Sequence, residues 1–328
     1  MDLEPLIGAR LVVGFGGTKA TPSLIARLRA LHIQHVIAFA RNYVSPEQFV
    51  GLVRGLEAGL ERRLLIMVDH EGGRVIRFRA GLTPFPDAST MGRTAGPAVI
   101  ERQGATEASE LRRLGVSVNL APCVDVRVAG GDPIIGDRAY GSDPALVSAC
   151  AQARIRGLQS HGVAACAKHF PGLGAVPRDP HQVLPTIQLD WPAMEAVHLA
   201  PFRAAMACGV ATIMSSHVCY PALGDPAGVP ATFSFRLIHD LLRTRLGFRG
   251  LILTDDLEMG ALRAWGAMRD VAIRATEAGH DLLLIGSNLG LAEEALSSLS
   301  DAYRRGCLSV AALEASAARA AALRQQFL

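Results

Sequence analysis

Eight short apolar stretches recur along the chain, and they constrain its fold more than any other feature. They cover residues 11–15, 35–39, 64–68, 116–120, 163–167, 211–214, 251–253 and 281–285. Most of these stretches are almost entirely apolar instead of alternating with polar residues, which is typical of parallel strands that are buried on both faces. The pattern therefore predicts a parallel sheet whose faces are covered by other elements of the chain.

Segments with helical periodicity lie between these stretches. The clearest span residues 46–60, 97–114, 144–161, 191–208, 235–246 and 268–279, and an Ala-rich segment at 311–324 predicts one terminal helix. Strands that alternate with helices predict an α/β fold, and eight such units predict a single (β/α)8 TIM barrel domain over residues 1–328. A doubly wound open sheet is the alternative, although no G-x-G-x-x-G follows the first stretch.

The composition narrows the class of protein. Half of the residues are hydrophobic and 19% are charged, so that a large aliphatic core can form. The net charge of +3 comes from interleaved Arg and Glu residues, which argues against nucleic-acid and membrane partners. The six cysteines show no C-x-x-C spacing, and no signal peptide or membrane span is recognisable. We expect a cytoplasmic protein without an obligate protein partner.

Polar residues follow five consecutive stretches, from the third to the seventh. The third is followed by Asp69, the fifth by Lys168 and His169, and the seventh by Asp255. The other residues at these exits are Asn119, Asp125, Ser215, Ser216, His217 and Asp256. Active sites of this barrel lie beyond the C-terminal ends of the strands, so these residues form a candidate site. For an Asp such as Asp256, a helix N-cap is the alternative role.

A Pro- and Gly-rich loop of about twenty residues follows Lys168 and His169, and we expect it to be mobile and functional. It contains Asp179 and His181, separated by Pro180. Proline restricts its own φ and the preceding residue, which predicts an extended triplet whose two polar side chains point the same way. The carboxylate would then hold the imidazole in one tautomer, as an acid/base dyad. An Asx-turn with an exposed histidine is the alternative.

Three roles are open to Lys168: a Schiff-base nucleophile, a fixed cation for a polar ligand, or half of a structural ion pair. The adjacent His169 favours the second role, because the two side chains would offer convergent donors to hydroxyl or carbonyl groups. Further donors come from Arg74, Arg77 and Arg138. Arg138 lies in a predicted turn, and a salt bridge to Asp137 or Asp143 is its alternative role.

Asp255 lies where an apolar strand stops, in a partly desolvated position that suits a nucleophile or an electrostatic stabiliser. It could also converge with His169, His181 and His217 on a metal ion. The chain has no H-E-x-x-H and no H-x-H at an early strand exit, so we expect no catalytic metal.

Several motifs, taken in their order and spacing, resemble one family. They are D-H-E-G-G-R-V-I-R-F from residue 69, I-G-D-R-A-Y from 135, K-H-F-P-G-L-G from 168, D-P-H at 179–181 and L-G-F-R-G-L-I-L-T-D-D-L-E-M from 246. The similarity extends over most of residues 8–290 and is to the bacterial β-N-acetylhexosaminidases of glycoside hydrolase family 3. It implies a barrel that removes terminal β-linked N-acetylglucosamine with retention, through a covalent intermediate and without a cofactor.

The resemblance also implies the roles of individual residues. Asp255 matches the nucleophile, and His181 with Asp179 matches the acid/base dyad. The positions that match those gripping the sugar hydroxyls and the 2-acetamido surroundings are Asp69, Arg77, Arg138, Lys168 and His169. The expected substrate is a small N-acetylglucosamine-containing glycoside, derived from cell-wall fragments.

Three positions depart from the pattern of this family. His70 stands where the family usually has glutamine, Leu173 where another histidine is common, and Pro180 where it has serine. A histidine in place of the second carboxylate of retaining glycosidases does not repel an incoming anion, which leaves phosphorolysis as an alternative reaction. Two further functions are open: a catalytically inactive sugar-binding barrel, and an aldolase or lyase that uses Lys168.

Overall fold

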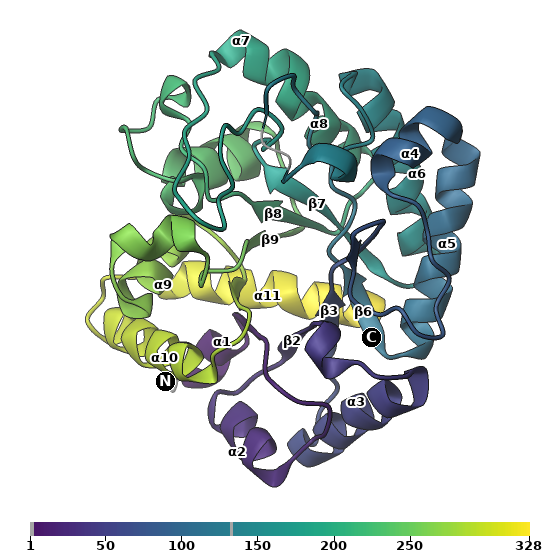
Figure 1. The fold of residues 1–328 in the computed structure, drawn as a ribbon. Coiled ribbons are helices and arrows are strands. Elements are labelled where there is room, and N and C mark those ends of the chain that lie inside the picture. The colour runs from purple at the N-terminus through teal and green to yellow at the C-terminus, as the bar shows by residue number, and fades with distance from the viewer. Residues whose placement is uncertain (1–2, 132–133) are drawn as a thin grey trace.

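The computed structural model describes residues 3–131 and 134–328, and eight parallel strands form one sheet in the order β10-β1-β2-β3-β6-β7-β8-β9 (Figure 1). They are β1 (Leu11–Val13), β2 (His35–Ala38), β3 (Leu65–Val68), β6 (Val116–Asn119), β7 (Ala164–Phe170), β8 (Thr212–Ser215), β9 (Leu251–Thr254) and β10 (Leu283–Ile285). The outer strands of this order meet where the Thr254 N–H donates to the Leu282 carbonyl at 3.1 Å. The predicted barrel is confirmed, and the open sheet is wrong.

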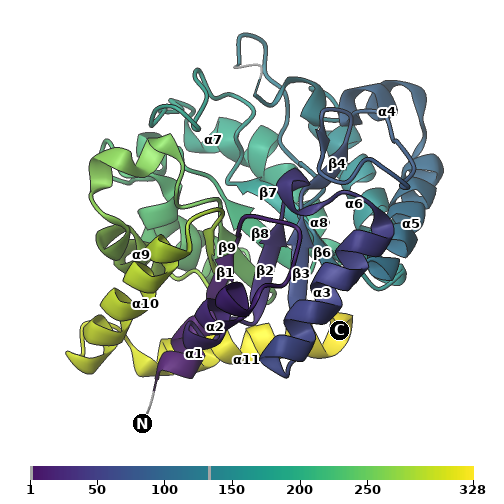
Figure 2. The ribbon, with the colours of Figure 1, turned by 60° about the horizontal axis from the view of Figure 1, so that its bottom comes forward.

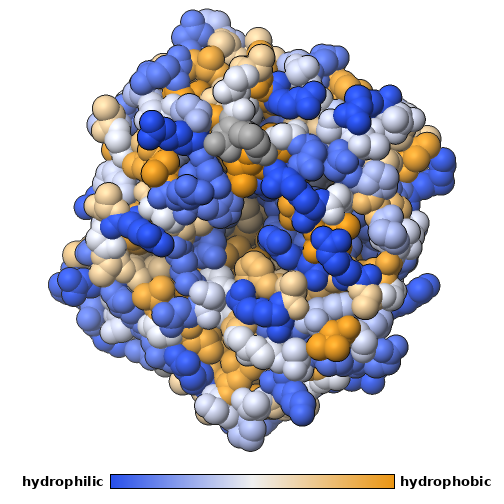
Figure 3. All heavy atoms as spheres, viewed as in Figure 1, coloured by the Kyte–Doolittle hydropathy of each residue, from blue (hydrophilic) through white to orange (hydrophobic). Residues whose placement is uncertain are grey.

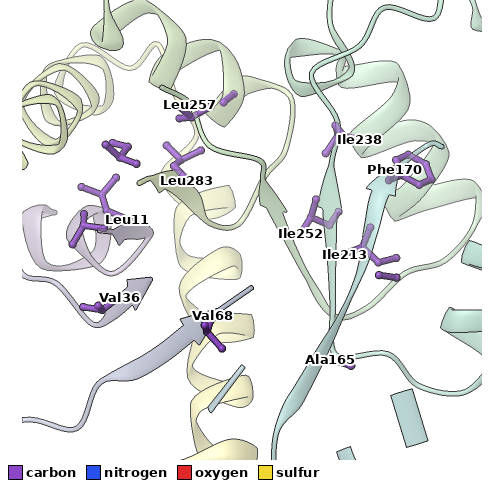
Figure 4. Close-up of a cluster of buried hydrophobic side chains, with 14 of the residues drawn as sticks. Leu11, Val36, Val68, Ala165, Phe170, Ile213, Ile238, Ile252, Leu257 and Leu283 are labelled. Carbon is purple, nitrogen blue, oxygen red and sulfur yellow. The ribbon is translucent and has the colours of Figure 1, made fainter. Parts of the chain in front are cut away.

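Successive residues of each strand point to opposite sides, and both sides are buried. In β1, Val12 belongs to the cluster inside the barrel, whereas Leu11 and Val13 belong to the cluster between the sheet and the helices. Figure 4 shows part of this outer cluster, with side chains from several strands. Because water reaches neither side of the strands, most of them do not alternate with polar residues. In β6, where Ser117 and Asn119 do alternate with valines, both polar residues are buried.

Helices cover the outside of the barrel. The α-helices are α1 (Glu4–Gly8), α2 (Pro22–Ala30), α3 (Pro46–Leu60), α4 (Ala88–Thr94), α5 (Pro97–Arg113), α6 (Pro144–Ser160), α7 (Trp191–Ala193), α8 (Leu199–Ala207), α9 (Met268–Glu277), α10 (Leu289–Arg304) and α11 (Val310–Phe327). Wider π-helical turns form η3 (Met194–His198) and η6 (Arg236–Arg245). The helix predicted at 191–208 is therefore divided into α7, η3 and α8.

The remaining short elements are 3-10 turns: η1 (Ala40–Asn42), η2 (Gly136–Arg138), η4 (Pro221–Leu223), η5 (Ala231–Phe233) and η7 (Gly260–Trp265). Two of them, η2 and η7, contribute to the site described below. Among the described residues, no helix combines the length and the apolar character needed to cross a membrane.

The terminal helix α11 crosses the amino-terminal end of the barrel (Figure 2). Its Ala320, Leu323 and Phe327 side chains belong to the cluster inside the barrel. Its Arg319 guanidinium donates to the fully buried Asp281 carboxylate at 2.6 and 2.9 Å. The predicted Ala-rich helix is confirmed, and it closes the end of the barrel opposite to the one where active sites of this fold lie.

A small antiparallel hairpin after β3 is not foreseen by the apolar pattern. It consists of β4 (His70–Gly72) and β5 (Val75–Ile76). Gly72 has a φ of 108°, and a Cβ added there would lie 2.5 Å from the Pro86 carbonyl oxygen. Only glycine fits this position. The hairpin turns the D-H-E-G-G segment back over the carboxyl end of the barrel.

Two fully buried histidines make the stability of the fold depend on pH. Burial lowers the pKa from 6.5 to about 3 for His35 and to about 4 for His280. The folded protein keeps both neutral, whereas the unfolded chain binds protons below about pH 6.5. Stability is therefore complete at pH 7 and is lost as the pH falls towards the folded pKa values. We expect the free energy of unfolding in urea to drop between pH 7 and pH 5 by about 2 kcal/mol for each histidine.

The variant His35→Gln removes one of these titrations. Its drop between pH 7 and pH 5 should be smaller than that of the wild type by about 2 kcal/mol, whatever its stability at pH 7. The exposed His239 supplies the matched control, because His239→Gln should leave the drop unchanged. A His35→Gln chain with the pH dependence of the wild type would contradict this account.

Candidate active site

The carboxyl ends of the strands open on one cavity with a volume of about 420 Å³. Figure 3 looks onto this face and shows a hollow near its middle, with hydrophilic side chains around it. Seven of the eight predicted site residues line the cavity: Asp69, Arg77, Arg138, Lys168, His169, His181 and Asp255. The eighth, Asp179, contacts His181. The fold thus brings together residues from four separate regions of the sequence.

Lys168 is a buried cation in the wall of this cavity. Its Nζ lies 2.7 Å from Asp69 Oδ1 and 2.7 Å from Glu71 Oε1. Burial by itself lowers the pKa of Lys168, but the two carboxylates raise it above its ordinary value. The ammonium group is therefore held charged. A Schiff base requires the uncharged amine, so these contacts argue against the aldolase or lyase alternative.

Glu71, which is not among the predicted site residues, joins two of the cations. Its carboxylate accepts from Arg138 Nε at 2.9 Å and from Arg138 Nη2 at 2.8 Å, in addition to its contact with Lys168. Burial alone raises the pKa of Glu71, but Arg138 and Lys168 hold it far below its usual range. The pairing of Arg138 with Asp137, considered above as an alternative, is wrong, because Asp137 pairs with Arg74 at 2.6 Å.

Asp69 is the second carboxylate of this wall and directly follows β3. Its Oδ1 contacts Lys168, and its Oδ2 lies 3.3 Å from Arg77 Nη2. Burial raises the pKa of Asp69, but Lys168 and Arg77 lower it below its ordinary value. The wall thus consists of ionised groups held at fixed positions by one another. Such an array offers hydrogen-bond donors and acceptors to a ligand rich in hydroxyl groups.

The loop over residues 171–190, called the dyad loop below, contains a turn where the sequence predicts an extended triplet. Asp179 Oδ1 accepts from the backbone N–H of His181 at 2.8 Å and lies 2.7 Å from His181 Nδ1. The Gln182 N–H donates to the Asp179 carbonyl at 3.1 Å. The extension is wrong because the Asp179 side chain bonds the backbone two residues on. The Asx-turn and the Asp–His pair are both present, although the sequence favours one or the other.

The dyad loop docks on η7, the element that follows the β9 exit. The Gly260 N–H donates to the His181 carbonyl at 3.1 Å, and the Ala261 N–H donates to the Pro180 carbonyl at 3.2 Å. A Cβ on Gly260 would lie 2.5 Å from the His181 carbonyl oxygen. These contacts place His181 at the cavity, with 55% of its side chain exposed. The mobility of the loop stays a prediction.

Asp255 directly follows β9 and faces the same cavity. Its Oδ1 accepts from the backbone N–H of Asp256 at 2.8 Å. Burial raises the pKa of Asp255, but this N–H and the charge of Lys168 help to lower it below its ordinary value. The carboxylate is therefore ionised near neutral pH. An ionised carboxylate without a tightly bound cation suits a nucleophile.

The residues after β8 form hydrogen bonds to the segment that follows β9. His217 Nε2 lies 2.9 Å from the Asp256 carbonyl oxygen, and its Nδ1 lies 2.5 Å from Thr232 Oγ1. The Asp256 carboxylate accepts from the backbone N–H groups of Glu258 at 3.1 Å and Gly286 at 3.0 Å. Asp256 thus caps a turn, which is similar to the helix N-cap considered above as its alternative role.

Among the residues that the structure describes, one group offers three metal-ligand atoms within 4.8 Å of one another: Cys123, Asp125 and His169. Asp125 Oδ2 already lies 2.7 Å from His169 Nδ1 and 3.3 Å from Cys123 Sγ. Burial raises the pKa of the Cys123 thiol well above its ordinary value, whereas a metal ligand must be a thiolate. These hydrogen-bonded groups do not fit an ion.

Known proteins are similar to this chain over most of its length. Residues 10–323 match the glycosyl hydrolase family 3 N terminal domain. The chain is 40% identical over 295 residues to a β-hexosaminidase from Nitrosomonas eutropha, and the match covers 88% of this chain and 84% of that relative.

Solved structures are similar over nearly the whole chain. A glycoside hydrolase family 3 β-N-acetylglucosaminidase from Paenibacillus sp. has a TM-score of 0.95 at 36% identity, and the match covers 99% of this chain and 62% of that one. NagZ from Neisseria gonorrhoeae, in complex with N-trifluoroacetyl-D-glucosamine, has a TM-score of 0.80 at 30% identity, with 96% and 97% covered. The chain therefore belongs to glycosyl hydrolase family 3 and is a glycoside hydrolase of the β-N-acetylhexosaminidase type.

Proposed function

We propose that this chain is a retaining exo-β-N-acetylglucosaminidase that releases terminal, non-reducing β-linked N-acetylhexosamine through a covalent intermediate on Asp255. One observation carries the proposal. An ionised, partly buried carboxylate and a histidine backed by a carboxylate face the same cavity. A nucleophile and an acid/base group beside one reacting bond are the two groups that a retaining mechanism requires.

In the first half-reaction the Asp255 carboxylate attacks the anomeric carbon while the bond to the leaving oxygen breaks. The protonated His181 gives its Nε2 proton to that oxygen. The Asp179 carboxylate, 2.7 Å from Nδ1, stabilises the imidazolium that must be present beforehand. The N–H of Asp256 orients the attacking carboxylate. The products are an alcohol and a glycosyl ester of Asp255.

In the second half-reaction a water molecule attacks the same carbon and the ester bond breaks. The neutral His181 takes the proton of this water and returns to the imidazolium form. Two successive inversions restore the β configuration of the sugar. An imidazole takes the place of the usual second carboxylate. The acid/base group is therefore uncharged when the water molecule approaches the glycosyl ester.

The sugar is held, in this proposal, by the fixed groups of the cavity wall: Asp69, Arg77, Arg138, Lys168 and His169. Two of the three proteins compared above are a β-hexosaminidase and a β-N-acetylglucosaminidase, which supports an N-acetylated amino sugar as the substrate. The proposed natural substrates are small glycosides from peptidoglycan fragments. This source rests on the sequence resemblance, the cytoplasmic location rests on the sequence features described above, and both stay predictions.

Replacement of the two proposed catalytic groups tests their roles. We expect Asp255→Ala to lower kcat on an aryl β-N-acetylglucosaminide by more than about 10⁴-fold, because the covalent step is lost. His181→Ala should lower kcat by about 10² to 10⁴-fold, and less for a leaving group that needs no proton. The exposed His239–Asp240 pair, 3.0 Å apart, provides the control His239→Ala, which should retain full activity. Near-wild-type turnover in either catalytic variant would remove that residue from the mechanism.

The products identify the reaction and its acceptor. Proton NMR of an early reaction mixture should show the β-anomer of N-acetylglucosamine, because the two inversions cancel. The same product is expected with and without phosphate. Formation of a sugar 1-phosphate in phosphate buffer would show that the reaction is phosphorolysis and not hydrolysis. Binding of N-acetylglucosamine without turnover of several aryl glycosides would instead establish an inactive sugar-binding barrel.

Gly260→Ala tests the docking of the dyad loop. The added Cβ would meet two backbone oxygens, of His181 at 2.5 Å and of Gln182 at 2.9 Å, and these cannot rotate away. We expect kcat to fall by about 100-fold through misplacement of His181, with the inhibition constant of N-acetylglucosamine unchanged. Gly51→Ala on α3 is the control, since a Cβ there meets nothing within 4 Å. Unchanged kcat in Gly260→Ala would show that this contact does not place His181.

A further inference from the structure

Asp125 lies behind the sugar-binding wall, and the proposed mechanism does not use it. Its side chain is fully buried, yet it gathers several hydrogen bonds. Oδ1 accepts from the backbone N–H of Leu173 at 2.6 Å and of His169 at 3.3 Å, and Oδ2 lies 2.7 Å from His169 Nδ1. One carboxylate thus contacts both a residue of the cavity wall and the first part of the dyad loop.

The neighbours of His169 determine where its ring carries the proton. Arg138 Nη2 lies 3.3 Å from His169 Nε2, and a guanidinium can only donate. Nε2 must therefore accept, which leaves the ring neutral with its proton on Nδ1. That proton points to Asp125 Oδ2. An ionised carboxylate has no proton to donate, so Oδ2 is the acceptor of this hydrogen bond. The two contacts agree on a single tautomer.

We infer that Asp125 is a positioning residue that holds His169 in the Nδ1–H tautomer, so that the one lone pair of Nε2, which accepts from Arg138 at 3.3 Å, is available to a sugar hydroxyl that takes the place of this donor. The inference rests on the proposed function, in which His169 contacts the sugar. It also revises the sequence interpretation that Lys168 and His169 are both donors.

An acceptor at this position complements the rest of the wall. The neighbouring Lys168, Arg77 and Arg138 carry only donors, whereas a sugar hydroxyl both donates and accepts. A hydroxyl group that accepts from Arg138 can give its own proton to His169 Nε2, in place of the direct contact between Arg138 and Nε2. An Nε2–H tautomer would instead turn two donors towards the same hydroxyl and leave only the carboxylates of the wall to accept its proton.

Asp125→Asn reverses this arrangement while keeping the shape of the side chain. The amide oxygen is favoured on the Oδ1 side, because Oδ1 accepts from the Leu173 N–H at 2.6 Å. The His169 N–H, which lies 3.3 Å from Oδ1 and 3.2 Å from Oδ2, then keeps only the Oδ1 contact, and the Cys123 thiol loses its acceptor. The amide NH₂ then faces His169 Nδ1, which has to become the acceptor. The ring proton moves to Nε2, opposite the Arg138 donor. The contact of the dyad loop through Leu173 is retained.

The tautomer is measured directly by ¹⁵N NMR of the histidine side chains near neutral pH, where protonated and unprotonated ring nitrogens resonate apart. The His169 signals are those that disappear in His169→Gln. We expect Nδ1–H in the wild type and Nε2–H in Asp125→Asn. An Nε2–H tautomer in the wild type would overturn the inference, even if the variant fails to fold. An unchanged Nδ1–H tautomer in a folded Asp125→Asn would do the same.

Binding separates this inference from the proposed function. Asp125→Asn should weaken inhibition by N-acetylglucosamine about tenfold, the value of one hydrogen bond to a ligand. A series of deoxy analogues of N-acetylglucosamine identifies the hydroxyl that contacts His169. The wild type and Asp125→Asn should bind the analogue that lacks this hydroxyl equally well. The control Asp143→Asn keeps its cap on α6, where the Ala145 N–H donates at 3.0 Å, and should bind as the wild type.

The two failures have different signatures. A wild type that does not bind N-acetylglucosamine contradicts the proposed function, while the NMR result still decides the tautomer. A wild type that binds the sugar, beside an Asp125→Asn variant that binds it equally well, contradicts the positioning role alone.

Discussion

The buried charge of Lys168 is the interaction on which the catalytic end of the barrel depends. An ammonium group with a side chain only 2% exposed is stable when carboxylates pair with it, and Asp69 and Glu71 each lie 2.7 Å away. These carboxylates require cations in turn, which Arg77 and Arg138 supply. Because the partners come from the exits of β3 and β7, from the β4–β5 hairpin and from η2, the charges hold four chain segments in one arrangement.

The barrel provides this arrangement at one end only. Its interior is filled by apolar side chains of the strands, and α11 closes the far end through Ala320, Leu323, Phe327 and the pair of Arg319 with Asp281. Asp281 at the far end is paired with Arg319 and Arg243, whereas the ionised groups at the carboxyl end face a cavity of about 420 Å³. Stability and chemistry are thus separated along the strand direction, as is general for this fold.

Parts of the site could be predicted because strand exits in a parallel barrel meet at one place. Asp69, Lys168, His169 and Asp255 all follow apolar stretches, so their convergence depends only on the fold class. Glu71 could not be found in this way, because its place depends on a hairpin closed by Gly72. Its signal is local, an acid followed by two glycines, and the periodicity of strands and helices does not include it.

The contacts of Asp125 could not be predicted from the sequence either, although its position could. Its position after a strand marked it as a strand-exit residue, but its bonds to His169 and Leu173 join residues 44 and 48 positions away. Asp179 and His181, although neighbours in sequence, were also wrongly predicted as extended. A hydrogen bond from a side chain to the backbone competes with the preference of Pro180, and the sequence does not say which prevails.

The sequence alone determined the alternation of strand and helix, the closed barrel, the terminal helix and which strand ends carry ionisable groups. These follow from local periodicity and from the burial of both strand faces. Only the tertiary structure decided which charges pair, which nitrogen of His169 faces the cavity and how the dyad loop docks on η7. Such choices depend on distances of a few ångströms between residues far apart in the chain, and hydrogen bonds and ion pairs are sensitive at that scale.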